Sequence, residues 1–158
     1  MNDTAAYDPH AWHDDTLYGL GFRIGDPERG DWRSDLVLDI DHIVEWLKLA
    51  NGRFGFRVAP AELVFHDVTD LKLAVDWGDS GGQVALNRPS IDQIVRRRQD
   101  PADQKICLDR PYHRWQILLN WPSGQVIAFG ASGYSLKLRA EPRLCEEQSL
   151  PSAARPGP

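Results

Sequence analysis

The chain has 158 residues, of which 42% are hydrophobic and 26% are charged, and its formal net charge is −5 at pH 7. A chain of this length and composition suits one globular domain. The acidic balance argues against nucleic acid as a partner, because a negative surface repels phosphate backbones at long range. No apolar run approaches the length of a membrane helix, and the first residues lack the basic and apolar regions of a signal peptide. We therefore expect a cytoplasmic protein without a membrane partner.

The two ends of the chain differ in composition from its body. Residues 1–10 are polar, and residues 151–158 (PSAARPGP) are rich in proline and small side chains. Segments of this kind bury too little apolar surface to become ordered. The sequence therefore predicts a flexible N-terminus over 1–10, a single globular domain over 11–150 and a disordered tail over 151–158. The two cysteines, Cys107 and Cys145, are too few for a disulfide framework, and we expect reduced thiols.

Apolar and polar residues alternate along most of the body, which is the pattern of half-buried β-strands. The clearest case is the last hairpin, where Trp115, Ile117 and Leu119 alternate with polar neighbours. A turn at Asn51-Gly52 separates two such stretches. The predicted strands are 16–24, 35–41, 61–65, 71–77, 113–121, 126–129 and 134–138.

One segment has a helical pattern instead. Ser90 is a suitable N-cap, Gln93 stands where a capping box places it, and residues 91–99 carry apolar side chains at helical spacing before Pro101. The sequence therefore predicts a mainly β fold of the α+β class. Its core is a two-layer antiparallel sheet or flattened barrel of about seven or eight strands, with one short helix near 91–99.

No known catalytic motif is complete. Residues 78–82 (GDSGG) match the nucleophile motif of chymotrypsin-like proteases, but the chain lacks that family's upstream histidine segment and is too short for two barrels. His–Asp neighbours occur at His13, His42 and His66, yet adjacent strand residues point to opposite faces and cannot chelate one ion. The sequence predicts neither a metal site nor a cofactor site, and no catalytic residue is assigned.

Three carboxylates share one face of a predicted strand. Asp35, Asp39 and Asp41 lie on the side opposite to Leu36, Leu38 and Ile40. Such a row is a plain solvated face, a contact for arginines of a basic partner, a calcium site or the carboxylate pair of a glycosidase.

The histidines allow a different interpretation. His13, His42, His66 and His113 are candidate acid–base groups of a tryptophan-lined pocket between the sheets, because histidine titrates near neutrality.

Several segments resemble a group of small bacterial proteins of unknown function. Residues 12–17 (WHDDTL) resemble their W-H-D-x-x-L opening, and residues 38–46 (LDIDHIVEW) resemble a D-I-D-x-I-x-E-W stretch. Residues 60–68 (PAELVFHDV) resemble a P-A-x-L-x-F-x-x-V strand, and the likeness continues over 115–150. That group is distantly similar to immunity proteins of bacterial toxin systems, which are small, catalytically inert proteins that cover a toxin's active site.

The resemblance implies a non-enzymatic binding protein, an immunity-type inhibitor of a basic protein partner. The candidate contact residues are His13, Asp14, Asp35, Asp39 and Asp41. The alternative is a small-ligand-binding protein or hydrolytic enzyme, with His42, His66 and His113 as its candidate pocket residues.

Overall fold

The fold is described from a computed structural model, which defines residues 7–79, 81–82, 86–100, 102 and 109–155. Ser80 of the protease-like motif and Cys107 lie outside these residues. None of the helices in the described part of the chain has the length and apolarity that crossing a membrane would require. Nine strands dominate: β1 (Thr16–Ile24), β2 (Ser34–Lys48), β3 (Phe54–His66), β4 (Thr69–Ala74), β5 (Ser90–Arg98), β6 (His113–Trp121), β7 (Val126–Ala131), β8 (Gly133–Leu138) and β9 (Arg143–Cys145).

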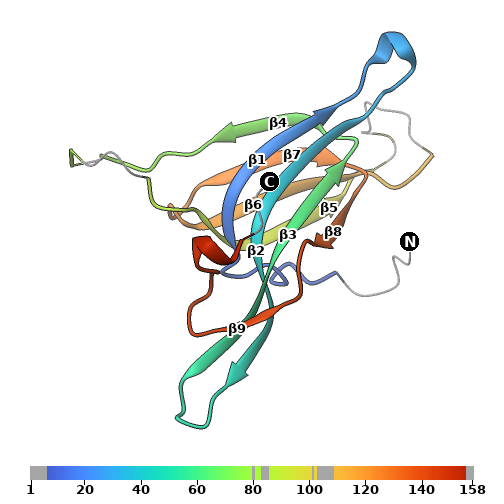
Figure 1. The fold of residues 1–158 in the computed structure, drawn as a ribbon. Helices are drawn as coiled ribbons and strands as arrows, with labels where there is room; N and C mark the ends of the chain where they lie inside the picture. The colour runs from blue at the N-terminus through green and yellow to red at the C-terminus, as the bar shows by residue number, and fades with distance from the viewer. Residues whose placement is uncertain (1–6, 80, 83–85, 101, 103–108, 156–158) are drawn as a thin grey trace.

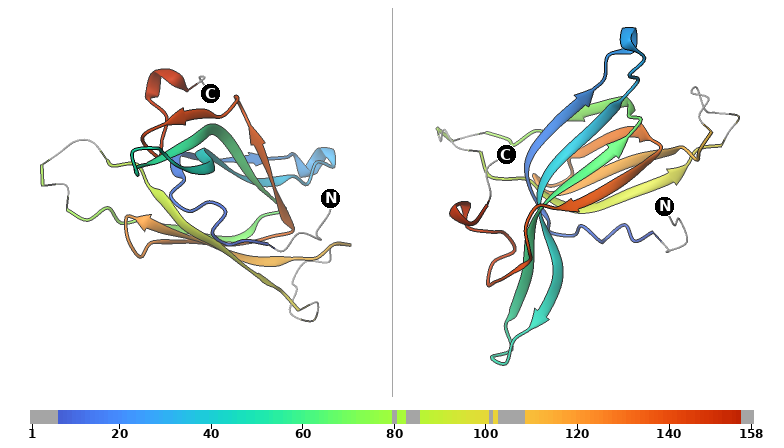
Figure 2. Two further views of the ribbon diagram at one scale, coloured as in Figure 1. Left: turned by 90° about the horizontal axis from the view of Figure 1, so that it is seen from below. Right: turned by 45° about the vertical axis from the view of Figure 1, so that its right-hand side comes forward.

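All strands belong to one antiparallel sheet in the order β4-β7-β6-β5-β1-β2-β3-β8, and β9 pairs with β3 (Figure 1). The sheet folds over between β5 and β1, where a single pair, Thr16 with Ser90, joins the two strands. Strands β4–β7–β6–β5 thus form one layer and β1–β2–β3–β8 the other, and the two layers face each other (Figure 2). The mainly β, two-layer antiparallel prediction is confirmed, and the sheet does not close into a barrel.

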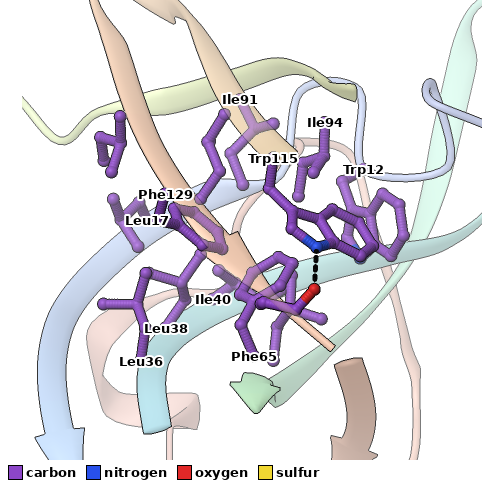
Figure 3. Packing of buried hydrophobic residues seen from close by; sticks show 14 of the residues in the cluster. Trp12, Leu17, Leu36, Leu38, Ile40, Phe65, Ile91, Ile94, Trp115 and Phe129 are labelled. Carbon is purple, nitrogen blue, oxygen red and sulfur yellow. Dashed lines mark hydrogen bonds between the residues drawn. The ribbon is translucent and has the colours of Figure 1, made fainter. Parts of the chain in front are cut away.

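The inward side chains of both layers build one core. Leu36, Leu38 and Ile40 of β2 are fully buried, as the alternation predicts. They meet Trp115 and Phe129 of the other layer, and the Trp115 indole donates a hydrogen bond to the carbonyl of Ala131 (3.1 Å; Figure 3). Burial of such large apolar side chains contributes about 1.5–3 kcal/mol each, so this core is the main reason that the two layers stay together.

The predicted helix at 91–99 is wrong, because this segment is strand β5. Ile91 pairs with Leu119 and Gln93 with Leu118, so the register slips at Asp92. A bulge adds one residue to a strand and shifts its inward–outward alternation. Ile91 and Ile94 therefore both reach the core although they are three residues apart, a spacing that is also typical of a helix.

At both ends of the chain, residues outside the predicted domain of 11–150 make packing contacts with the sheet. Tyr7 lies against Trp12 and Trp115, with ring centroids 5.9 and 5.7 Å apart, and its hydroxyl donates to the carbonyl of Ile94. At the other end, Arg155 forms ion pairs with two aspartates of β2. Residues 7–10 and 151–155 thus belong to the folded body, because the ring of Tyr7 packs against the core and Arg155 pairs with the aspartates of β2.

Candidate functional site

The acidic row on β2 lies on the outer face of its layer, where arginines of this same chain neutralise it. Asp39 forms ion pairs with both Arg139 and Arg155. Arg23 of β1 pairs with Glu62 of β3 on the same face at 2.5 Å. The candidate contact for a basic partner is therefore already occupied by cations from the chain itself.

Asp41 is sealed from water by the segment that follows β9. Its side chain is fully buried, and it accepts hydrogen bonds from the Leu150 amide (2.7 Å) and from Arg155 (2.5 Å). The Arg155 guanidinium also lies 3.5 Å from the centroid of the Tyr18 ring. A buried carboxylate is stable only when it is paired and hydrogen-bonded, so residues 150–155 act as a strap held down by Asp41.

A second buried carboxylate joins the start of β1 to β2. Asp15 is fully buried, and it accepts hydrogen bonds from the His42 ring (2.7 Å) and from the Ile43 amide (2.8 Å). Burial raises the pKa of Asp15 above its ordinary value, and the contact with His42 opposes this shift. His42 is thus held by a structural partner and does not line either of the two hollows described below.

His66 bridges two strands in an arrangement with known chemistry. Its Nδ1 lies 3.1 Å from Asp35 Oδ1, and its Nε2 lies 2.9 Å from the Ser135 hydroxyl. A carboxylate only accepts hydrogen bonds, so in the neutral ring Nδ1 carries the proton and Nε2 accepts from Ser135. Ser135, His66 and Asp35 are therefore hydrogen-bonded in the same order as the members of a serine–histidine–aspartate triad. The His66 side chain is 35% exposed.

The other candidate residues lie elsewhere. Asp14 accepts hydrogen bonds from Asn120 and from Gln148 (2.8 Å), which ties the start of β1 to β6 and to the strap region. His13 lies 3.0 Å from the carbonyl of Asp92. His113 is buried, with its ring 5.9 Å from that of Trp115. The structure therefore does not bring the candidate histidines together into one pocket, and the described residues contain no group of three metal-ligating side chains.

Part of the β2–β3 hairpin projects beyond the body (Figures 1 and 2). We call residues 44–56 the arm. Trp46 and Phe54, on one face of the arm, are 46% and 57% exposed. Their rings are 6.4 Å apart, and Trp46 also packs edge-on against Phe56 at 4.9 Å. The arm therefore presents the rings of Trp46 and Phe54 to solvent, and we call these two rings, together with the buried Phe56 that supports Trp46, the aromatic cluster.

Two hollows of about 450 Å³ each mark the surface. The first lies on the outer face of the β4–β7–β6–β5 layer, and arginines contribute much of its lining. The second lies beside the strap, next to Arg88 and Cys145. Burial raises the pKa of the Cys145 thiol, which therefore favours its unreactive protonated form.

No known protein family, no curated protein and no solved structure matches this chain. The site must therefore be interpreted from its own residues.

Sequence reasoning missed four residues that organise this face: Asp15, Ser135, Arg139 and Arg155. The alternation pattern places Ser135 on the outer face of its strand, but nothing in it shows that β8 lies beside β3. Arg155 stands in a segment whose composition predicts disorder. Its role depends on a carboxylate 114 residues earlier, and no local pattern carries that information.

We predict that Arg155→Met lowers the free energy of unfolding by about 3–5 kcal/mol, because it leaves a buried carboxylate without its cation. Urea unfolding of the full chain measures this effect. Arg33→Met is the matched control and should change stability little, since its pair with Asp31 is exposed to solvent. The double variant Arg155→Met with Asp41→Asn should recover part of the loss. Equal effects of Arg155→Met and Arg33→Met would contradict the buried pair.

We also predict a pH dependence that originates from Asp15. A carboxyl group whose pKa rises on folding keeps its proton in the folded state where the unfolded chain has lost it. The free energy of unfolding should therefore fall as the pH rises from 3.8 toward the raised pKa. Asp15→Asn removes this pH dependence. The free energy of unfolding of the variant should therefore increase relative to that of the wild type as the pH rises from 3.8 toward the raised pKa of Asp15.

Asp31 provides a control of opposite sign for this measurement. Arg33 holds the pKa of Asp31 below its ordinary value, so its stabilising contribution is present above 3.8 and lost as the pH falls through the lowered pKa. Urea unfolding of wild type, Asp15→Asn and Asp31→Asn over a pH series separates the two. A stability difference between Asp15→Asn and wild type that does not vary with pH would contradict the shift.

Proposed function

We propose that this chain is a non-enzymatic binding protein that holds a basic protein partner on the aromatic cluster of its arm. The observation that carries the proposal is the exposure of Trp46 and Phe54 on a hairpin that leaves the body of the fold. An immunity-type inhibitor that covers its target works in this way, through surface complementarity and without chemistry of its own.

The arm has features that a purely structural hairpin does not need. A two-stranded ribbon outside a core is marginally stable in water, so exposed aromatic rings on it add little to the fold. Trp46 pairs with Phe56 and Lys48 with Phe54 across the ribbon, which places all four side chains on one face. That face therefore shows two exposed aromatic rings, Trp46 and Phe54, and a lysine, beside the buried ring of Phe56.

The chemistry of this row suits an interface. Tryptophan is enriched among residues that dominate binding energy, since it offers a large rigid surface for little loss of conformational entropy. Val44, at the base of the arm, is also 45% exposed. Trp46 already packs edge-on against Phe56, so binding a partner requires little further ordering of its ring.

The net charge of −5 favours a basic partner through long-range attraction. The acidic row of β2 contributes to that field only weakly, because Arg139 and Arg155 neutralise Asp39 and Arg155 neutralises Asp41. We therefore assign direct contact to the arm and assign to the overall charge only the speed of association. High salt should slow binding more than it weakens the bound state.

Site-specific photo-crosslinking in the native cell tests this proposal. A photoreactive phenylalanine analogue replaces Trp46 in one variant and Leu73 in the other. Leu73 is the matched control, since it is 49% exposed and lies on β4, away from the arm. We expect a discrete adduct with one basic protein from position 46 and none from position 73.

The purified partner then gives a quantitative check. Phe54→Ala should weaken its binding by about tenfold or more, as expected for the loss of an interface aromatic. An adduct between two copies of this chain would identify the arm as a self-association surface and overturn the proposal. The absence of any adduct specific to position 46 would do the same.

A second function, ester or amide hydrolysis, is favoured by one specific observation. Ser135, His66 and Asp35 are hydrogen-bonded in series at 2.9 and 3.1 Å. In such a series the histidine takes the serine proton as the oxygen attacks a carbonyl, then returns it to the leaving group, and water releases the acyl group. A cleft beside Ser135 would strengthen this alternative, but neither of the two hollows includes that residue.

A fluorophosphonate reagent distinguishes the two functions. An activated Ser135 should displace fluoride and gain one phosphonyl group, which intact-protein mass spectrometry detects. Ser135→Ala and His66→Asn should both lose the modification, whereas Ser123→Ala, in the exposed β6–β7 turn, should retain it. An unmodified wild type would leave His66 with a purely structural role and support the binding function.

A further inference from the structure

The outer face of the β4–β7–β6–β5 layer carries a hollow whose charge is opposite to that of the whole protein. Lys72, Arg97, Arg98 and Arg114 surround it, together with Asp70 and Asp100. Four cations against two carboxylates give the hollow a local charge of +2, whereas the chain as a whole carries −5. A concentration of cations in an acidic protein indicates a site for an anion.

Strand register explains why the surface is hollowed at this point. Lys72 pairs with Ala128, Ala128 with Gln116, and Gln116 with Val95, so one row of side chains crosses four strands. Paired residues of antiparallel strands point to the same face. The small Ala128 therefore lies between the long side chains of Lys72 and Gln116 and forms the floor.

A second row supplies the arginines. Arg114 pairs with Gly130 on one side and with Arg97 on the other, two residues along each strand from the first row. Tyr112 and Thr69 occupy the space where a Cβ of Gly130 would lie, so the hollow does not extend over Gly130. Arg97 and Arg114 are both exposed and stand side by side at one wall.

Like charges on directly paired residues destabilise a sheet, so the pair of Arg97 and Arg114 is unfavourable for the fold. Asp70 lies 3.1 Å from Arg114 and compensates one of the two. Within the described part of the chain, Arg97, Arg98 and Lys72 form no ion pair. A doubly negative ligand would remove this repulsion and match the local charge.

We infer that this hollow binds a phosphorylated small molecule, with its phosphate held by the paired Arg97 and Arg114 at one wall and with Lys72 on the opposite wall. Arginine forks bind phosphate oxygens in pairs, and lysine adds a point charge. A volume of about 450 Å³ exceeds what a phosphate alone requires and falls in the range of small-molecule sites, so it leaves room for an organic group over Val95 and Ala128. A nucleic-acid strand suits the hollow less well, because the surrounding negative charge repels a long polyanion.

Calorimetric titration of the full chain with inorganic pyrophosphate at low ionic strength tests the site. Pyrophosphate should bind with one-to-one stoichiometry and lose affinity as salt is added. Arg97→Gln should weaken binding by about tenfold or more, the effect of losing a charge-assisted hydrogen-bonding partner. Arg29→Gln is the matched control, since it also removes one cation, from an exposed turn that does not line the hollow. This variant should bind pyrophosphate like the wild type.

A second variant tests the shape of the hollow without changing its charge. Ala128→Leu fills the floor and should abolish binding of a sugar phosphate while the thermal unfolding temperature stays near that of the wild type. Equal weakening by Arg97→Gln and Arg29→Gln would show that only net charge matters and would overturn the site. Tighter binding of an oligothymidine than of pyrophosphate would overturn the small-molecule assignment. The arm variants should leave these titrations unchanged, so this inference and the proposed function fail independently.

Discussion

The architecture depends on a sheet that turns back on itself where its backbone ladder is weakest. At the boundary between β1 and β5, Thr16 and Ser90 are the single paired position, and a short set of backbone hydrogen bonds joins residues 14–17 to residues 89–91. The shared core adds most of the contact between the layers, and the chain ends assist it. Tyr7 and Trp12 pack against the core from the N-terminal side, and residues 150–155 cover the outer face of β2. The two buried carboxylates, Asp15 and Asp41, lie where these end segments join the sheet, which explains why such costly groups are kept inside.

The distribution of charge follows from the same arrangement. Arg23, Arg139 and Arg155 neutralise the acidic outer face of β2 and β3, whereas on the opposite outer face, within the described residues, Asp70 pairs with Arg114 and Arg97 forms no ion pair. A net charge computed from composition therefore describes the long-range field and not the local chemistry of either face. The arm, which projects from the body, belongs to neither face. Three regions with different chemistry, aromatic, triad-like and cationic, thus stand on one small fold without overlapping.

The sequence predicts the strands well where apolar and polar residues alternate without interruption. Strands 16–24 and 113–121 have the bounds expected from alternation, and the turn at Asn51-Gly52 lies between β2 and β3. The prediction fails at β5, where a bulge at Asp92 gives strand residues a helical spacing. The site is harder to predict than the fold. Alternation assigns Asp39 and Asp41 to an outer face, but burial there depends on Arg155, which no local rule connects to them. Likewise, Asp35, His66 and Ser135 meet only because three strands are neighbours, and that order is a property of the topology.

The strap has a consequence for the order in which the molecule can be completed. Asp41 is synthesised 114 residues before the arginine that neutralises it. Strands β1 to β3 are adjacent in sequence and can pair early, since their contacts are local. Asp41 on the outer side of β2 stays exposed to solvent at that stage, because burying an unpaired carboxylate has a large free-energy cost. The outer side of β2 therefore reaches its final buried state late in folding, when Arg155 pairs with Asp41.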